Sequence, residues 1–295
     1  MKHPSIHTKE PFQQNIVRLI HFYNQLAIEY LQKQSNVHEN IHQTRLCFKR
    51  IRSFLRLGRS GLGEQFYRHY NAFYRDLSRS LSQLRDFTAL IETLPAFIKT
   101  RRTQASKAFL TSLRNHLLIQ RKQQLDDIIA GNTKADVIRA LQNKGGEISK
   151  WDFAADAREV FTSGAARIFR RGKRLFLLAQ SNPDDHNMHE WRKQVKYFWY
   201  HLLVLTPVWP EMMSAWAKEV QMLSQLLGKH HDLVLLENMI DAMEKEPELI
   251  SLIKSLKQSI RMRKLQFERR CLELGAKVYA EGPASVGERL KAYWA

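Results

Sequence analysis

Residues 41–55 read IHQTRLCFKRIRSFL, and residues 188–202 read MHEWRKQVKYFWYHL. Both segments contain the pattern H-x-x-R-x-x-x-K, and the second copy follows the first at an offset of 147 residues. The pattern places His42 on His189, Arg45 on Arg192 and Lys49 on Lys196. Spacings of three and four residues return to one face of an α-helix. The two segments therefore predict related helices in the two halves of the chain.

A second pair of segments supports an internal duplication. Residues 77–91 read LSRSLSQLRDFTALI, residues 223–237 read LSQLLGKHHDLVLLE, and their offset is 146 residues. Four positions match: Leu77 with Leu223, Leu81 with Leu227, Asp86 with Asp232, and Leu90 with Leu236. Two matches in the same order at nearly the same offset indicate a duplicated four-helix unit, divided near Gly145–Gly146.

The rest of the chain also has the apolar spacing of amphipathic helices, and no set of alternating strands is visible. Many of the 12 glycines and 8 prolines fall between the apolar segments. The predicted helices lie near 12–34, 37–57, 63–94, 97–129, 152–180, 185–205, 209–244 and 247–279. The expected fold class is all-α.

Composition points to an anionic partner. Lys and Arg number 47 against 29 Asp and Glu, a formal net charge of +18. Such a surface repels itself and favours binding to nucleic acid, polyphosphate, an acidic protein or an anionic membrane. Two cysteines without a CxxC partner, no signal peptide and no apolar run of about 20 residues favour a soluble cytoplasmic protein without a membrane partner.

The helix at 37–57 carries a basic stripe that lies directly beside its apolar stripe. The basic stripe consists of His42, Arg45, Lys49, Arg52 and Arg56, and the apolar stripe of Ile41, Thr44, Phe48, Ile51 and Leu55. Like charges one turn apart repel, and Glu39 is the only acid in the segment. A solvated basic face is the simplest interpretation. However, the stripe carries one sign of charge and recurs as His189, Arg192, Lys193 and Lys196, which favours an anion-binding site.

Basic residues on neighbouring helices are candidates to close a groove around the anion. They include Arg79, Arg85 and Arg114 in the first half and His231 in the second. Arginine binds phosphate oxygens with two parallel hydrogen bonds, and lysine acts as a mobile point charge. A line of such donors suits a repeating linear anion.

The histidines and acids do not form a recognisable catalytic or metal site. Arginines follow His42 and His189 by three residues and would repel a cation, so no metal is expected. Asp86 and Asp232 are interpreted as acids that position a basic side chain. The motifs of nucleotide-binding loops, zinc proteases and serine hydrolases are missing. We therefore expect a protein that is not an enzyme and needs no cofactor.

These motifs, in this order and spacing, resemble the CHAD family, the conserved histidine α-helical domain. The resemblance implies two four-helix bundles with pseudo-twofold symmetry, a basic groove or channel between them, polyphosphate binding and association with polyphosphate granules and their proteins. It implies a domain over 12–280, with repeats 12–146 and 147–280 between tails 1–11 and 281–295. Its basic motif falls on His42, Arg45, Lys49 and Arg52, then on His189, Arg192, Lys193 and Lys196. Its Arg-Asp pair falls on Arg85–Asp86 and on His231–Asp232.

The sequence also departs from the family pattern. Trp199 stands where a second-half arginine is expected opposite Arg52, and Ser82 stands where a glycine is expected. The first-half helix is therefore predicted to bind the anion more tightly. The CYTH triphosphatase domain that often accompanies the family is missing. Besides polyphosphate binding, the sequence leaves open an RNA-binding protein, a scaffold for an acidic partner, and a phosphohistidine carrier or enzyme that uses His42 or His189.

Overall fold

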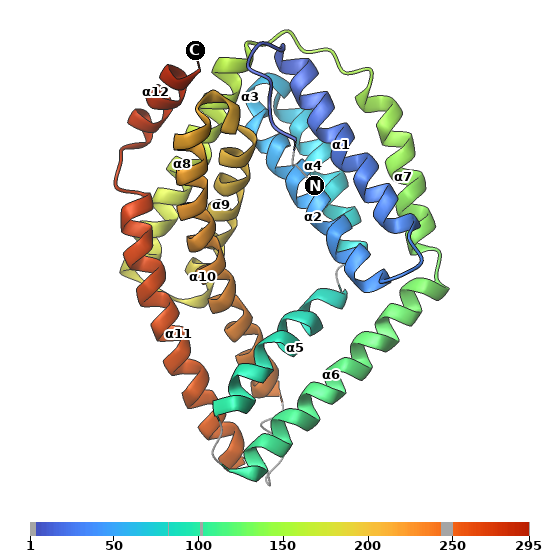
Figure 1. Cartoon of the computed structure of the whole chain (residues 1–295), viewed down its shortest axis with the longest axis vertical. Coiled ribbons are helices and arrows are strands. Elements are labelled where there is room, and N and C mark those ends of the chain that lie inside the picture. Colours follow the sequence, from blue (N-terminus) through green and yellow to red (C-terminus); the bar gives the residue numbers. More distant parts are fainter. Residues whose placement is uncertain (1–3, 82, 101–102, 243–249, 295) are drawn as a thin grey trace.

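The computed structural model describes residues 4–81, 83–100, 103–242 and 250–294, without the side chains of 83–86. Within these residues every regular element is a helix, which confirms the all-α fold (Figure 1). The first half contains α1 (Phe12–Gln32), α2 (Val37–Leu57), α3 (Arg59–Leu62), α4 (Glu64–Ser80), α5 (Gln83–Thr100), α6 (Gln104–Ala130) and α7 (Thr133–Ile148). The second half contains α8 (Ala157–Ser181), α9 (Asp185–Val204), the 3-10 turn η1 (Thr206–Val208), α10 (Pro210–Ala242), α11 (Ile250–Val278) and α12 (Pro283–Tyr293).

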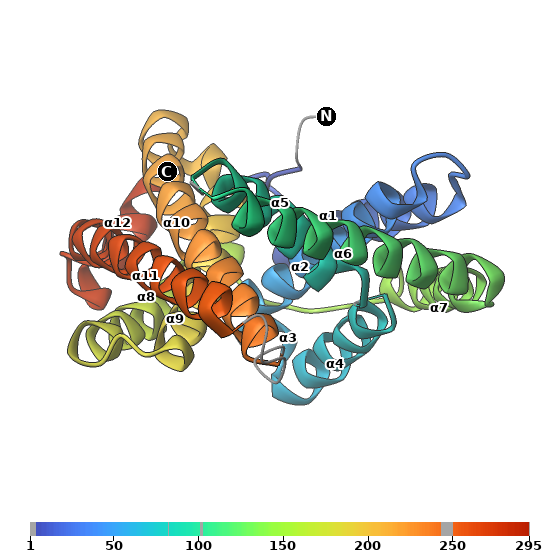
Figure 2. The same cartoon turned by 90° about the horizontal axis from the view of Figure 1, so that it is seen from below.

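Two hydrophobic cores hold the helices together. The larger core joins α1, α2, α4 and α7 of the first half to α8, α9, α11, α12 and the first part of α10. The smaller core joins α5 and α6 to the C-terminal part of α10 and the N-terminal part of α11. It includes residues such as Leu94, Leu113, Leu236 and Ile253. It forms the lower tip of the molecule in Figure 1 and lies nearest the viewer in Figure 2.

The predicted continuous helix at 63–94 is wrong, because α4 ends at Ser80 and α5 begins at Gln83. The sequence LSRSLSQ at 77–83 is rich in serine, and the hydroxyl of Ser80 donates a hydrogen bond to the carbonyl of Leu77. Serine side chains compete in this way for backbone groups and weaken a helix. The matching second-half sequence, LSQLLGK at 223–229, lies inside the uninterrupted helix α10.

Helix α7 was not predicted, because Gly145 and Gly146 suggested a boundary between the two halves. Both glycines instead lie inside α7, whose buried Val137, Leu141 and Ile148 face the core. The amide of Asn24 in α1 donates to the carbonyl of Leu141 over 3.0 Å and fixes the helix against α1.

The segments expected to be tails also belong to the folded domain. Residues 281–295 contain α12, which begins at Pro283 and buries Val286 and Leu290 against α8. Residues 1–11 include Ile6, which is fully buried and donates its backbone N–H to the carbonyl of Val204 over 3.0 Å. Both ends of the chain therefore add surface to the larger core.

The two cysteines are buried free thiols, as expected. Cys47 lies in α2 and Cys271 in α11, and burial raises the pKa of each thiol to about 12. Neither thiol is therefore ionised near neutral pH. No helix in the described part of the chain is long and apolar enough to cross a membrane.

A buried ion cluster fixes the start of α9. Lys264 of α11 lies 2.8 Å from Asp185 Oδ1 and 2.7 Å from Glu237 Oε2, and its side chain is only 12% exposed. Burial opposes the charge of the ammonium group, but the two carboxylates raise the pKa of Lys264 above its usual value. The cluster ties together α9, α10 and α11.

Replacing Lys264 with Ala should lower the free energy of unfolding by about 2 kcal/mol, because the partly buried Glu237 and the more exposed Asp185 would lose their counter-ion. Urea denaturation followed by circular dichroism measures this change. The control is Arg269→Ala, which removes an exposed pair with Glu273 and should cost under about 1 kcal/mol. Equal costs for the two variants would contradict the structural role of Lys264.

His201 is the second buried group that predicts a stability change. It is fully buried, its Nε2 lies 2.9 Å from the carbonyl oxygen of Ser53, and its Nδ1 has no hydrogen-bond partner in the described structure. Burial is the main reason that the pKa of His201 falls to about 3. The neutral ring is thus required in the folded state.

The folded state binds fewer protons at His201 than the unfolded state, whose histidine pKa is about 6.5. This contribution to stability is complete above pH 6.5 and is lost, at about 1.4 kcal/mol per pH unit, as the pH falls toward 3. Urea titrations at several pH values should show a smaller slope for His201→Gln, whereas the exposed control His116→Gln should keep the wild-type slope. An unchanged slope in His201→Gln would contradict this assignment.

A basic cavity between two helices

Helix α2 places its basic stripe at the edge of the core, as the sequence predicts. The five residues of the apolar stripe are all buried: Ile41, Thr44, Phe48, Ile51 and Leu55. Three residues of the apolar stripe are each followed directly by a basic residue: Thr44 by Arg45, Phe48 by Lys49 and Ile51 by Arg52. All three basic residues are partly buried. Their stems lie against the core, and their charged ends reach its border.

Helix α9 repeats this arrangement in the second half. Its buried face contains Met188, Trp191, Val195, Phe198 and Leu202. Partly buried basic residues follow three of these positions: His189 after Met188, Arg192 and Lys193 after Trp191, and Lys196 after Val195. The Asp184 carboxylate begins the helix by accepting the backbone N–H of Asn187 over 2.7 Å.

The C-terminal parts of α2 and α9 are held together directly. The hydroxyl of Ser53 donates to the carbonyl of Tyr197 over 3.3 Å, and Ser53 in turn accepts at its own carbonyl from His201. The guanidinium of Arg56 lies 4.1 Å from the centre of the Tyr197 ring. These contacts fix how the basic stripes of the two helices face each other.

In front of this contact lies a cavity of about 280 Å³, which we call the α2–α9 cavity. Its ten described lining residues include six Arg or Lys side chains and two histidines, and none of these ten is a carboxylate. They are Arg45, Lys49 and Arg52 from α2; His189, Arg192, Lys193, Lys196, Tyr197 and Tyr200 from α9; and His231 from α10. The structure thus brings together eight of the predicted site residues.

Arg52 shows the electrostatic cost of this arrangement. Its Nε donates a hydrogen bond of 3.1 Å to Oδ1 of Asn71, and this partner is a neutral amide. Burial lowers the pKa of the Arg52 guanidinium, and the neighbouring Arg56 and Arg75 lower it further. A cation held among cations and away from water is stabilised by an anion that enters the cavity.

The two histidines of the α2–α9 cavity lie against each other. The ring centroids of His189 and His231 are 4.7 Å apart. Burial is the largest cause of a lowered pKa at His189, and the charges of Arg192 and Lys193 lower it further. His189 is therefore mainly neutral near pH 7. A bound anion would oppose the effect of the two cations and favour protonation of the ring.

Lys193 forms an ion pair with Glu190 on its own helix. Burial opposes ionisation of Glu190, but the hydrogen bond from Lys193 outweighs it and the pKa of Glu190 is lowered. The charge of Lys193 is thus partly compensated within the protein.

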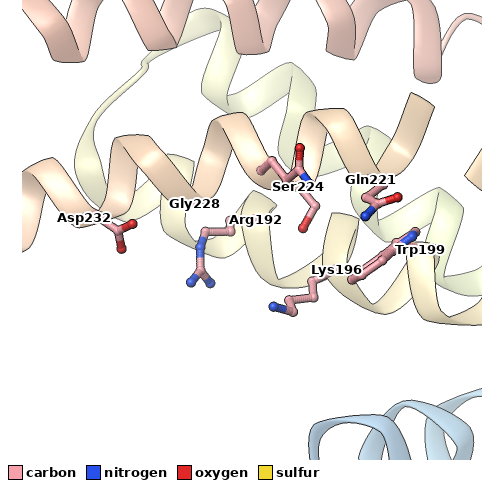
Figure 3. Close-up of a pocket in the computed structure, with 8 residues that line it drawn as sticks. Arg192, Lys196, Trp199, Gln221, Ser224, Gly228 and Asp232 are labelled. Carbon is pink, nitrogen blue, oxygen red and sulfur yellow. The ribbon is translucent and has the colours of Figure 1, made fainter. Parts of the chain in front are cut away.

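A second cavity, of about 260 Å³, lies between α9 and α10, and we call it the α9–α10 cavity (Figure 3). Arg192 and Lys196 line both cavities, so the two are neighbours. The remaining residues of its lining are Trp199, Gln221, Ser224, Gln225, Gly228 and Asp232. Asp232 thus lines the same cavity as Arg192.

Other predicted site residues do not line either cavity. His42 lies one turn before Arg45 on α2, and Arg56 is occupied by the Arg52 carbonyl, 2.8 Å away, and by the Tyr197 ring. Arg79 is 71% exposed and lies 3.8 Å from Asp76. Arg114 lies on α6, and its Nε is buried without a hydrogen-bond partner in the described structure. The side chains of Arg85 and Asp86 lie outside the described part of the structure.

Sequence reasoning missed the uncharged residues of the site. Tyr197 and Tyr200 line the α2–α9 cavity, and Gln221, Ser224 and Gln225 line the other. Tyr200 follows Lys196 by four residues and Arg192 by eight, so helical spacing already placed it on the basic face. The three residues of α10 had no comparable signal, because a charge pattern does not mark neutral polar groups.

The described residues contain no group of three His, Cys, Asp or Glu side chains arranged to hold a metal ion. The α2–α9 cavity instead offers guanidinium and ammonium donors, together with two tyrosine rings and two imidazoles. Such a set of donors binds phosphate or carboxylate oxygens through charge-assisted hydrogen bonds.

Fold and site together define an all-helical protein with a basic cavity between helices from its two halves. The sequence profile of the CHAD domain matches residues 24–241, and the chain therefore belongs to the CHAD family. Its fold is similar to that in the crystal structure of the CHAD domain from the plant Ricinus communis, with a TM-score of 0.67. That similarity covers 95% of this chain and 96% of the plant chain at 16% sequence identity. No curated protein matches the chain in sequence.

The lowered pKa of His189 can be measured by NMR titration of the histidine ring protons. We expect His189 to titrate below about 6.5, the ordinary value. In the double variant Arg192→Gln/Lys193→Gln its pKa should rise only part of the way, since burial remains. No upward shift of His189 would show that the two cations do not act on the ring.

Proposed function

We propose that this protein binds inorganic polyphosphate in the α2–α9 cavity and does not hydrolyse it. The observation that carries the proposal is the composition of the lining, which has six cationic side chains, two histidines and no carboxylate. The described lining therefore concentrates positive charge in one place. A polyanion is the class of ligand whose charge is complementary to it.

The arrangement of the cations favours a linear anion over a single compact one. Arg45, Lys49 and Arg52 occupy successive turns of α2, and a rise of 1.5 Å per residue spreads them over about 10 Å. Arg192 and Lys196 provide a second row on α9. One orthophosphate could contact only part of these rows, whereas a phosphate chain presents a charge at each repeat unit.

Arg52 supports the proposal energetically. Its guanidinium is partly removed from water and has a neutral side chain, Asn71, as its hydrogen-bond partner. Hydrogen bonds from charged groups contribute roughly 1.5–3 kcal/mol each. Binding of a phosphate oxygen would therefore recover part of the free energy spent in burying this charge.

Membership of the CHAD family agrees with this proposal, because polyphosphate binding is the function that the sequence resemblance implies. We further propose that the protein associates with polyphosphate granules, together with other granule proteins, in the cytoplasm. Binding to RNA or to an acidic protein partner is the alternative that the experiments below separate from it.

The site assignment predicts the result of a quadruple substitution. Changing Arg45, Lys49, Arg192 and Lys196 to Ala should weaken binding of long-chain polyphosphate by at least about 100-fold, because several charge-assisted hydrogen bonds are lost. Filter binding at several salt concentrations measures the affinity. The decrease of affinity with rising salt should also be less steep in the variant, since fewer ionic contacts remain.

The matched control removes the same number and type of charges outside the two cavities. Arg171, Arg174, Lys218 and Lys254 are exposed, and their replacement by Ala should change the affinity by only a few fold. Equal losses in the two quadruple variants would show that net charge and not the cavity governs binding. Displacement of polyphosphate by RNA at equal phosphate concentration would favour the nucleic-acid function instead.

A further inference from the structure

The α9–α10 cavity has a chemical character different from that of its neighbour. Only Arg192 and Lys196, which it shares with the α2–α9 cavity, carry positive charge. The rest of the lining consists of an indole, two primary amides, a hydroxyl, a glycine and one carboxylate. Its volume of about 260 Å³ is several times the roughly 30 Å³ that a water molecule occupies in the liquid. The cavity can therefore hold an organic group.

The duplicated sequence pattern shows which charges are missing here. The basic segments of the two halves match at an offset of 147 residues, and there Trp199 corresponds to Arg52. The second pair of segments matches at an offset of 146 residues, and there Gln221 corresponds to Arg75 and Gln225 to Arg79. Met222 likewise takes the position of Asp76. Three arginines and one aspartate in the first half thus correspond to four uncharged residues in the second. The second-half compartment is suited to a group with less charge than a phosphate.

The uncharged residues supply the contacts that a planar heterocycle uses. Figure 3 shows Trp199 beside Gln221 and close to Ser224, while Arg192 and Lys196 project away from α10. An aromatic ring stacks on a base of any sequence, and amides offer both a donor and an acceptor to a base edge. Trp199 Nε1 is also buried without a hydrogen-bond partner in the described structure.

The remaining features fit a sugar and an open entrance. Asp232 lies at the end of the cavity near Arg192, where a carboxylate can accept hydrogen bonds from hydroxyl groups. At Gly228 an added Cβ atom would meet nothing within 4 Å, so the cavity is open at this position. The shared Arg192 and Lys196 are the natural partners of phosphates attached to the same ligand.

We propose that the α9–α10 cavity binds the nucleoside part of a nucleoside polyphosphate, with its phosphates on Arg192 and Lys196. The proposal rests on the proposed function, because the phosphates occupy part of the same basic site as polyphosphate. A free phosphate chain uses the α2–α9 cavity alone, whereas a nucleoside triphosphate gains the additional contacts beside Trp199.

The test compares ATP with inorganic tripolyphosphate on the full chain by isothermal titration calorimetry, in the absence of divalent cations. Tripolyphosphate carries at least as much negative charge, so simple electrostatics favours it. We expect ATP to bind about 10-fold more tightly, a factor within the range that stacking of a base on an aromatic ring supports. Equal or weaker binding of ATP overturns the proposal.

Two variants locate the source of the preference. Trp199→Ala should remove it while leaving tripolyphosphate binding unchanged. Trp199→Arg, which introduces the residue found at the matching first-half position, should bind tripolyphosphate more tightly and prefer it to ATP. A preference for ATP that survives in both variants overturns the proposal.

A third variant avoids the risk that a change at Trp199 disturbs folding. Gln225 is exposed and Gln221 partly buried, so Gln221→Ala/Gln225→Ala leaves the core intact and should reduce the ATP preference at least 3-fold. Arg79→Ala, at the exposed position that matches Gln225, should leave the preference unchanged. An unchanged preference in the double glutamine variant overturns the proposal.

Long-chain polyphosphate is titrated in parallel to separate the two proposals. Tight binding of polyphosphate without a preference for ATP overturns the nucleoside site alone. If neither polyphosphate nor ATP binds, both the nucleoside site and the polyphosphate function are wrong.

Discussion

The close contact between the C-terminal end of α2 and the second half of the chain is the constraint on which the site depends. A Cβ atom at Gly164 of α8 would lie 2.0 Å from the carbonyl oxygen of Leu57, so only glycine allows the two helices to approach this closely. Arg167 of α8 donates to the carbonyl of Arg56 over 2.6 Å at the same place. Together with the contacts of Ser53 to α9, these interactions fix the two basic helices relative to each other and leave the cavity between them.

The charges of the cavity are tolerated because the side chains that carry them rest on a large apolar core. Apolar residues of α2 and α9 anchor the basic side chains at their stems, and the buried His201 joins the helices without adding a charge. The burial of apolar surface in the larger core thus offsets the mutual repulsion among the cations. A site built in this way exchanges stability for affinity, since the same clustered positive charges that oppose folding favour an anion.

The two halves of the chain share a sequence motif but differ in shape and charge. In the first half the helical segment breaks between α4 and α5, whereas α10 is continuous over the matching length of the second half. The break between α6 and α7 has a counterpart between α11 and α12. The charge differs as well, because Trp199, Gln221 and Gln225 stand where the first half has arginines. The α2–α9 cavity uses what the halves have in common, and the α9–α10 cavity uses what distinguishes them.

Local pattern in the sequence was sufficient for the all-α class, the bounds of helices such as α1, α2 and α9, and the eight cationic and histidine residues of the α2–α9 cavity. The reason is that a spacing of three and four residues fixes which side chains share a helix face, whatever the rest of the fold does. Sequence could not reveal the break after Ser80 or the helix across Gly145 and Gly146, because packing against other helices overrides local propensity. Nor could it show that Arg45 lines a cavity whereas Arg79 is exposed to solvent, because the two side chains carry the same charge. That distinction, and the neutral lining from α10, came only from the tertiary structure, since a cavity depends on how helices distant in sequence are placed in space.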